Sequence, residues 1–196
     1  VPVRRALYDY YVTGDVNGPA RTLAWAKVEE IDDDGLWQSL REQAYRYFKT
    51  TGSGAWLYGL RLLLEAQGAA DARAEGYDLA TASDGDLAPY ASHRFLYDGA
   101  GRVIEEFVRG GESHFAFAWM TRASDPGFAA VNEWYRRCIE SRPDGSTHTV
   151  YTNRSGSTIL SILRDSTTGN AWAEFQVFNA DHHRTLLATP AAIESW

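Results

Sequence analysis

The stretch Tyr97-Asp98-Gly99-Ala100-Gly101-Arg102-Val103-Ile104 predicts a tight reversal between two β-strands. The Asp98 side chain can accept hydrogen bonds from nearby backbone amides, and Gly99 and Gly101 can adopt the positive φ angles that short hairpin loops require. Apolar residues lead into this loop and out of it. We therefore expect a β-hairpin with strands at residues 93–98 and 102–108.

The same stretch resembles the YD repeat of Rhs-type proteins, in which Tyr-Asp-x-x-Gly-Arg-aliphatic is followed by a glycine and by alternating aromatic residues. Gly110, Phe115 and Phe117 supply the later part, so the resemblance covers residues 97–117. In that family, successive copies wind into a β-structured shell. We find one copy and no other internal repeat, and a single unit must bury its apolar face on the rest of its own domain.

The second half of the chain has the two-residue period of β-strands. Phe115, Phe117 and Trp119 alternate with His114 and small residues, which predicts a strand. Turn-rich segments then separate three further predicted strands, at 147–152, 158–163 and 171–178. One helix is expected between these strands, from Asp125-Pro126 to about Arg142, with Cys138 on its apolar face.

Apolar residues in the first third recur at three- and four-residue steps, which favours helices. We expect a short helix near residues 7–11 and longer ones at 19–31 and 36–49. Residues 55–66 fit a helix or a buried strand, and the helix is preferred. Residues 83–89 are expected to form an exposed connection.

Together these patterns predict an α+β fold with N-terminal helices followed by a mainly antiparallel sheet. The sheet consists of the hairpin and a meander, and one helix is inserted into it. We expect a single domain over residues 1–196, helical over about 1–80 and sheet over about 90–190.

Composition restricts the possible partners. The chain has 196 residues and a net charge of −7, which disfavours binding to nucleic acid or to anionic lipid. One cysteine excludes an internal disulfide and a cysteine-based zinc cluster. No apolar run is long enough for a signal peptide or a membrane span, so we expect a cytoplasmic protein without cofactor. The initial valine suggests a GTG start codon, and hence a bacterial gene.

The most promising residues for chemistry lie in the segment Ala-Trp-Ala-Glu-Phe-Gln-Val-Phe, where Trp172, Glu174 and Gln176 should share one face of a strand. If His114 were aligned with that face, His114 and Glu174 could act as acid and base in a lyase, isomerase or hydrolase. Trp172, Gln176 and His148 are then the candidate ligand-binding residues. Alternatively, these are half-exposed residues on the solvent side of an antiparallel sheet.

Asp181-His182-His183 invites comparison with a metal site or with the DHH phosphoesterases. Adjacent histidines in a strand point to opposite faces, and no second Asp/His cluster has metal-ligand spacing. A solvated turn after the last strand is the favoured interpretation, and no metal site is expected. Cys138 is expected to be a small core residue.

Three classes of function remain. The first is a protein–protein interaction module, with an immunity- or antitoxin-like role suggested by the resemblance to Rhs-type systems. The second is a small enzyme or ligand-binding domain with a pocket between the helices and the sheet. The third is a structural piece of a larger assembly. The sequence favours the first class and leaves enzymatic activity open.

Overall fold

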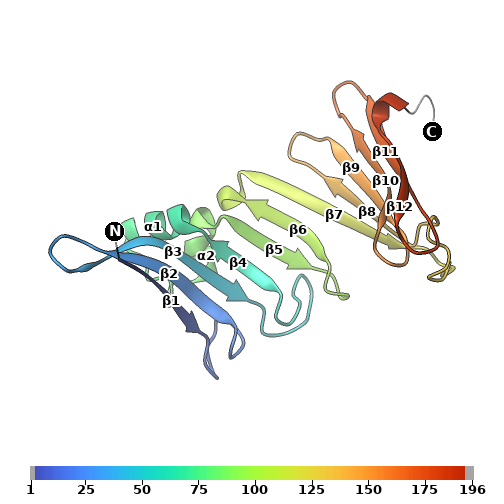
Figure 1. The fold of residues 1–196 in the computed structure, drawn as a ribbon. Coiled ribbons are helices and arrows are strands. Elements are labelled where there is room, and N and C mark those ends of the chain that lie inside the picture. The colour runs from blue at the N-terminus through green and yellow to red at the C-terminus, as the bar shows by residue number, and fades with distance from the viewer. Residues whose placement is uncertain (1–2, 193–196) are drawn as a thin grey trace. The chain divides into compact units, whose positions relative to one another are not determined.

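A computed structural model describes residues 3–192 and consists mainly of antiparallel β-structure (Figure 1). The strands are β1 (Arg4–Tyr10), β2 (Leu23–Ile31), β3 (Trp37–Tyr47), β4 (Leu60–Leu64), β5 (His93–Tyr97), β6 (Val103–Val108), β7 (Ser113–Thr121), β8 (Arg136–Ser141), β9 (Thr147–Thr152), β10 (Thr158–Arg164), β11 (Ala171–Phe178) and β12 (Arg184–Ala188). The helices are α1 (Ala66–Ala74) and α2 (Asp84–Leu87), with 3-10 segments at Ala88–Tyr90, Arg109–Gly111 and Pro190–Ala192.

The chain divides into two compact units, residues 1–114 and residues 115–196. In the first unit, strands β1 to β6 pair in the order of the chain, and each pair is antiparallel. In the second unit, the strands from β7 to β12 form a meander of the same kind. Consecutive strands are therefore neighbours within each unit, and short loops suffice to connect most of them.

The predicted N-terminal helices are wrong, and with them the α+β fold class. Residues expected to be helical form β1, β2 and β3, and each of the two units is mostly antiparallel β-sheet, with short helices only. A β-bulge explains part of the helix-like spacing of apolar residues in β3. The β2–β3 register shifts at Leu40, so Trp37 and Ala44 share a face although they are seven residues apart. An extra residue in a strand interrupts its alternation and imitates helical spacing.

The helix predicted from Asp125 to Arg142 is also absent. Residues 122–135 form a long loop, and strand β8 follows it. The Asp125 side chain accepts a hydrogen bond from the Gly127 N–H, and Gly127 has a φ of 77° that ends any helical turn. Of the two structures left open for residues 55–66, the strand is correct, because β4 occupies Leu60–Leu64.

The predicted hairpin is confirmed, and its loop recurs along the chain. Strands β5 and β6 pair as expected, and the Asp98 N–H donates to the Arg102 carbonyl while the Gly101 N–H donates to the Asp98 carbonyl. The fourth loop residue, Gly101, has a φ of 77°. Five-residue loops with the same two backbone bonds and a positive φ at the fourth residue begin at Asp32, Asp98, Arg142, Asn153 and Asn179.

In most of these loops, the side chain of the first residue forms hydrogen bonds with the backbone of the same loop. In four of the five, the first residue is Asp or Asn, and its side-chain oxygen accepts hydrogen bonds from the N–H groups of the third and fifth residues. Burial raises the pKa of Asp98, but hydrogen bonds from Arg102 and Ala100 outweigh it and hold that pKa below its usual value. The same side-chain chemistry therefore stabilises hairpin loops in both units.

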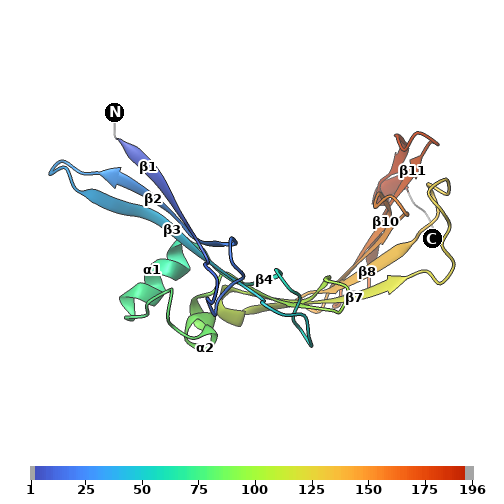
Figure 2. The ribbon, with the colours of Figure 1, turned by 90° about the horizontal axis from the view of Figure 1, so that it is seen from below.

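The buried core lies in the first unit, between its sheet and the helices. Figure 2 shows α1 and α2 on the same side of this sheet. The buried cluster joins Ala44, Leu62 and Leu64 of the strands to apolar residues of the covering segments, namely Ala69, Ala72, Leu79, Leu87 and Ala91. A capping box at Ser83 and Asp86 starts α2. This Ser-x-x-Asp pattern was the sequence signal for a helix where we expected an exposed connection.

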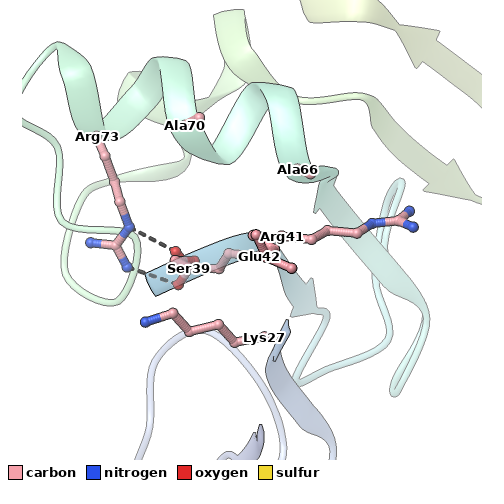
Figure 3. A pocket seen from close by; sticks show the side chains of 8 residues that line it. Lys27, Ser39, Arg41, Glu42, Ala66, Ala70 and Arg73 are labelled. Atoms are coloured by element: carbon pink, nitrogen blue, oxygen red, sulfur yellow. Dashed lines mark hydrogen bonds and ion pairs between the residues drawn. The ribbon is translucent and has the colours of Figure 1, made fainter. Parts of the chain in front are cut away.

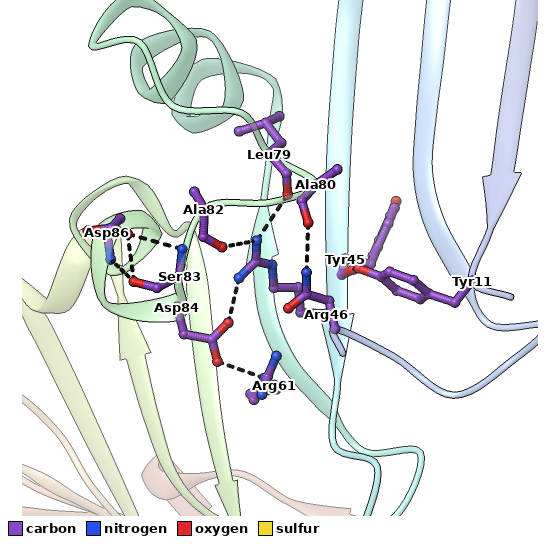
Figure 4. Close-up of polar contacts among 11 residues, drawn as sticks. Tyr11, Tyr45, Arg46, Arg61, Leu79, Ala80, Ala82, Ser83, Asp84 and Asp86 are labelled. Carbon is purple, nitrogen blue, oxygen red and sulfur yellow. Dashed lines mark hydrogen bonds and ion pairs between the residues drawn. The ribbon is translucent and has the colours of Figure 1, made fainter. Parts of the chain in front are cut away.

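Arg46 fastens the segment before α2 to the sheet (Figure 4). Its guanidinium is 2% exposed and donates to the Asp84 carboxylate at 2.7 Å. It also donates to the carbonyls of Leu79 and Ala82 at 3.0 and 2.7 Å. Nearby, the Tyr11 hydroxyl donates to the Tyr45 carbonyl, and burial raises the pKa of Tyr11 to about 12. Buried polar groups therefore anchor this layer as well as apolar contacts.

The second unit is built differently, because no α-helix covers its sheet in the residues that the structure describes (Figure 2). Its buried apolar residues are Val131, Ile159 and Ala173 in the same range. The loop before β8 is fixed by Asn132, which exchanges two hydrogen bonds with the Phe178 backbone. Much of this sheet is consequently a single layer with half-exposed side chains.

The hairpin loops predict unequal effects of one substitution at two glycines. Both Gly101 and Gly35 have φ near 80°, which costs an alanine about 1–2 kcal/mol. A Cβ on Gly101 would also lie 2.7 Å from the Trp56 ring, whereas a Cβ on Gly35 would meet nothing within 4 Å. We expect Gly101→Ala to reduce the free energy of unfolding by about 2–4 kcal/mol and Gly35→Ala by about 1 kcal/mol, in urea unfolding. Equal losses would show that Trp56 moves aside without cost.

A second prediction concerns Arg46. Arg46→Met leaves two carbonyl oxygens and the Asp84 carboxylate without a buried donor, so we expect it to reduce the free energy of unfolding by about 3 kcal/mol. The matched control is Arg4→Met, which removes an ion pair to Glu30 from a side chain that is 61% exposed, and should cost less than about 1 kcal/mol. Thermal and urea unfolding measure both. Similar stabilities for the two variants would contradict the anchoring role.

Candidate functional site

The candidate residues of β11 lie on one face, as the sequence predicts. Trp172, Glu174 and Gln176 alternate with Ala173 and Phe175, and the Gln176 amide donates to the Glu174 carboxylate at 3.0 Å. The register extends this face across the unit. We call it the open face, and its residues are Phe117, Trp119, Cys138, Glu140, His148, Val150, Ser161, Leu163, Trp172, Glu174, Gln176 and Leu187.

His148 lies in the middle of the open face and links two neighbouring strands. Its Nε2 lies 2.7 Å from the Ser161 Oγ, and its Nδ1 lies 3.4 Å from a Glu140 carboxylate oxygen. The other oxygen of Glu140 accepts from the Arg142 Nε at 2.9 Å. Strands β8, β9 and β10 thus place a carboxylate, an imidazole and a hydroxyl in hydrogen-bonded order.

This order is that of a hydroxyl nucleophile, a base and a carboxylate that orients the base. The imidazole can accept the hydroxyl proton through Nε2 if its own proton is on Nδ1, facing the carboxylate. Ser161 is paired on both sides, with Val150 and Glu174, so its backbone belongs to the sheet. The arrangement is therefore a preformed hydrogen-bonded chain on a flat surface.

His114 belongs to the first unit, where it has partners of its own. Its Nε2 lies 3.0 Å from the Glu105 carboxylate, and its ring stacks on Phe107 with a centroid separation of 4.5 Å. Glu174 belongs to the second unit. Each of the two proposed acid–base residues thus has a hydrogen-bonding partner within its own unit.

Asp181-His182-His183 forms the hairpin loop between β11 and β12. The predicted solvated turn is correct, although a further strand follows it. His182 takes the positive φ of the fourth loop position, at 63°. In the described part of the chain, no group of three or more His, Cys, Asp or Glu side chains is arranged to hold a metal ion. Cys138 lies in β8 and is half-buried, instead of on a helix.

A pocket of about 490 Å³ lies between α1 and strands β2 and β3 in the first unit (Figure 3). The ligand-binding hypothesis placed a pocket between N-terminal helices and the later sheet, but those helices are strands, and none of the predicted site residues lines this pocket. Arg73 donates to both carboxylate oxygens of Glu42 at 2.8 and 2.9 Å, and this contact raises the Arg73 pKa. The other charged lining residues are Lys27 and Arg41.

Sequence reasoning missed Glu140 and Ser161, which complete the hydrogen-bonded chain around His148. Glu140 lies near the end of β8 and Ser161 lies in the middle of β10. The pairing of these two strands with β9 brings both residues to His148. The available signal was one polar residue beside apolar ones on each outer strand, Glu140 on β8 and Ser161 on β10. Reading it required β8 to be recognised as a strand, and that segment carried helical spacing.

No family model matches the sequence, and no curated protein is similar to it. No helix in the described residues is long and apolar enough to span a membrane. The evidence on function therefore comes from the surfaces of the two units.

Proposed function

We propose that this protein is a protein–protein interaction module that binds its partner through the open face of the second unit. The observation that carries the proposal is that no described segment of the second unit covers this face. None of its twelve residues is buried in the described structure, although it includes large aromatic and aliphatic side chains. Exposed apolar surface within a polar surround is typical of binding sites.

The composition of the open face supports this function. Trp172 and Leu187 are each 44% exposed, and they lie at the β11–β12 side of the face. Large aromatic side chains dominate the energetic centres of protein interfaces. The polar row of Glu140, His148 and Ser161 supplies hydrogen-bonding groups between the apolar residues, as in ordinary interfaces.

The charge of the chain indicates the chemistry of the partner. Glu140 and Glu174 lie on the open face, and the chain carries a net charge of −7. A partner that offers basic and apolar side chains is complementary to this surface, whereas nucleic acid is repelled. An immunity- or antitoxin-like role in the cytoplasm is one form of this function, and the single cysteine is compatible with a reducing compartment.

The test uses a photo-crosslinking amino acid at position 187 on the open face, in cells of the source organism. We expect it to capture a defined protein that the same group at Thr167, in an exposed loop, does not capture. With that protein purified, Trp172→Asp should weaken binding by about 30-fold, because it places a charge at an interface centre. Calorimetry measures the affinity.

The matched control is Phe175→Asp. Phe175 lies on the same strand, is 38% exposed and points to the opposite face. We expect its variant to bind normally. Equal losses in the two variants, or no partner captured at position 187, would overturn the proposal.

A second candidate function, hydrolysis of an ester or a related acyl compound, is favoured by the Glu140–His148–Ser161 chain. In the first half of this reaction the Ser161 Oγ attacks the carbonyl carbon while its proton passes to His148 Nε2, and the protonated imidazole then gives that proton to the leaving alkoxide. In the second half a water molecule attacks the acyl-serine, its proton passes through His148 to the Ser161 oxygen, and the carboxylic acid is released. The open face gives a substrate free access to the hydroxyl. This function ranks second because the pocket beside this chain is lined by Phe115, Glu140 and Arg142, and neither the nucleophile nor the base is among its lining residues.

A fluorophosphonate probe tests this candidate directly. Attack by the Ser161 Oγ on phosphorus expels fluoride and leaves a stable serine phosphonate, which intact-protein mass spectrometry detects. We expect labelling in the wild type, about a hundredfold slower labelling in His148→Gln, and none at this position in Ser161→Ala. Ser155→Ala, in an exposed loop, is the matched control and should label normally. Absence of labelling at Ser161 in the wild type would exclude the candidate.

A further inference from the structure

A cavity of about 350 Å³ in the first unit combines apolar walls with cationic groups. It lies where α2 meets strands β4, β5 and β6. The volume is in the range of small-molecule sites, which are mostly apolar with a few polar groups. Its lining residues are Phe48, Arg61, Leu62, Asp84, Arg94, Phe95, Leu96 and Phe107.

The charges around this cavity do not balance. Asp84 is its only acidic lining residue among those described, and both carboxylate oxygens are already engaged. One oxygen pairs with Arg46 at 2.7 Å and the other with Arg61 at 2.9 Å. A single carboxylate therefore serves two guanidinium groups, and the cationic charge of Arg94 is added to theirs.

None of the ion pairs among the described residues includes Arg94. Its Nε is buried and has no hydrogen-bond partner among the described residues, and its guanidinium lies 4.8 Å from the centre of the Phe107 ring. The acidic residues of β6 are directed to histidines. Glu105 contacts His114 at 3.0 Å, and Glu106 contacts His93 at 2.7 Å.

An Arg guanidinium held over an aromatic ring keeps its hydrogen-bonding fork available to a planar anion. Phe107 and Leu96 supply an apolar surface beside that fork. Leu96 lies two residues after Arg94, on the same face of β5, and Phe107 is the cross-strand neighbour of Arg94. A buried donor without a partner gains more from a carboxylate than a solvated donor does.

We propose that this cavity is a binding site for a small aromatic carboxylate. The Arg94 fork binds the carboxylate, and the aromatic body of the ligand lies against Leu96 and the edge of the Phe107 ring, since Arg94 and His114 already lie over that ring. The site lies entirely in the first unit and is independent of the function proposed for the open face.

The test measures binding of 2-naphthoate to the full chain by calorimetry. We expect saturable binding of one molecule per chain, with NOEs between the naphthoate ring protons and the Leu96 methyl groups. The uncharged analogue 2-naphthamide should bind at least about tenfold more weakly, because it cannot form the charge-assisted pair with Arg94. Arg94→Gln should weaken naphthoate binding by about 10- to 100-fold, and Arg94→Lys by an intermediate factor.

Arg136→Gln is the matched control, because Arg136 also lies on a strand beside an aromatic ring, 5.4 Å from the centre of Tyr135, but in the second unit. It should leave naphthoate binding unchanged. Circular dichroism establishes that each variant is folded. If Arg94→Gln fails to fold, the naphthamide comparison and the NOEs in the wild type decide the question. Absence of saturable binding, equal affinity for naphthoate and naphthamide, or equal affinity in folded Arg94→Gln would overturn the proposal.

Discussion

The backbone of this protein reverses direction through one recurring geometry, in which the fourth residue of a five-residue loop takes a positive φ. Gly101 does this between β5 and β6, and Gly156 between β9 and β10. A loop of this kind fixes which residues of the two strands face each other, because the strands start from a defined pair. The register then decides which side chains share a face. The open face follows in part from these loops, because they join β8 to β9, β9 to β10 and β11 to β12.

The two units complete their sheets by different means. In the first unit, α1 and α2 cover one face, and Arg46 anchors that layer through backbone carbonyls and Asp84. In the second unit the described residues include no such helical layer, so Trp172 and Leu187 stay exposed. A sheet that leaves large apolar residues in water gains stability from any partner that buries them. The proposed interaction function is the consequence of this missing layer.

The arginines show how position decides the role of a side chain. Arg46 is satisfied by Asp84 and two carbonyls and contributes to folding. Arg94 lies on the same face of this sheet, two strands away from Arg46, with a buried Nε that has no protein partner in the described residues. Nothing in the sequence around either arginine distinguishes the two roles. Only the placement of the carboxylates separates a structural arginine from a candidate ligand-binding one.

The sequence by itself determined the local features: the Asp98–Gly101 hairpin loop, the alternation in β11 that places Trp172 and Glu174 on one face, and the turn at His182. These depend on backbone geometry and side-chain chemistry within a few residues. Tertiary structure decided whether β3 is a helix or a strand, because the bulge at Leu40 hides its alternation and only pairing with β2 restores it. It also decided that Ser161 and Glu140 meet His148, since contacts across strands depend on the pairing register, and the pattern of β8 did not identify it as a strand.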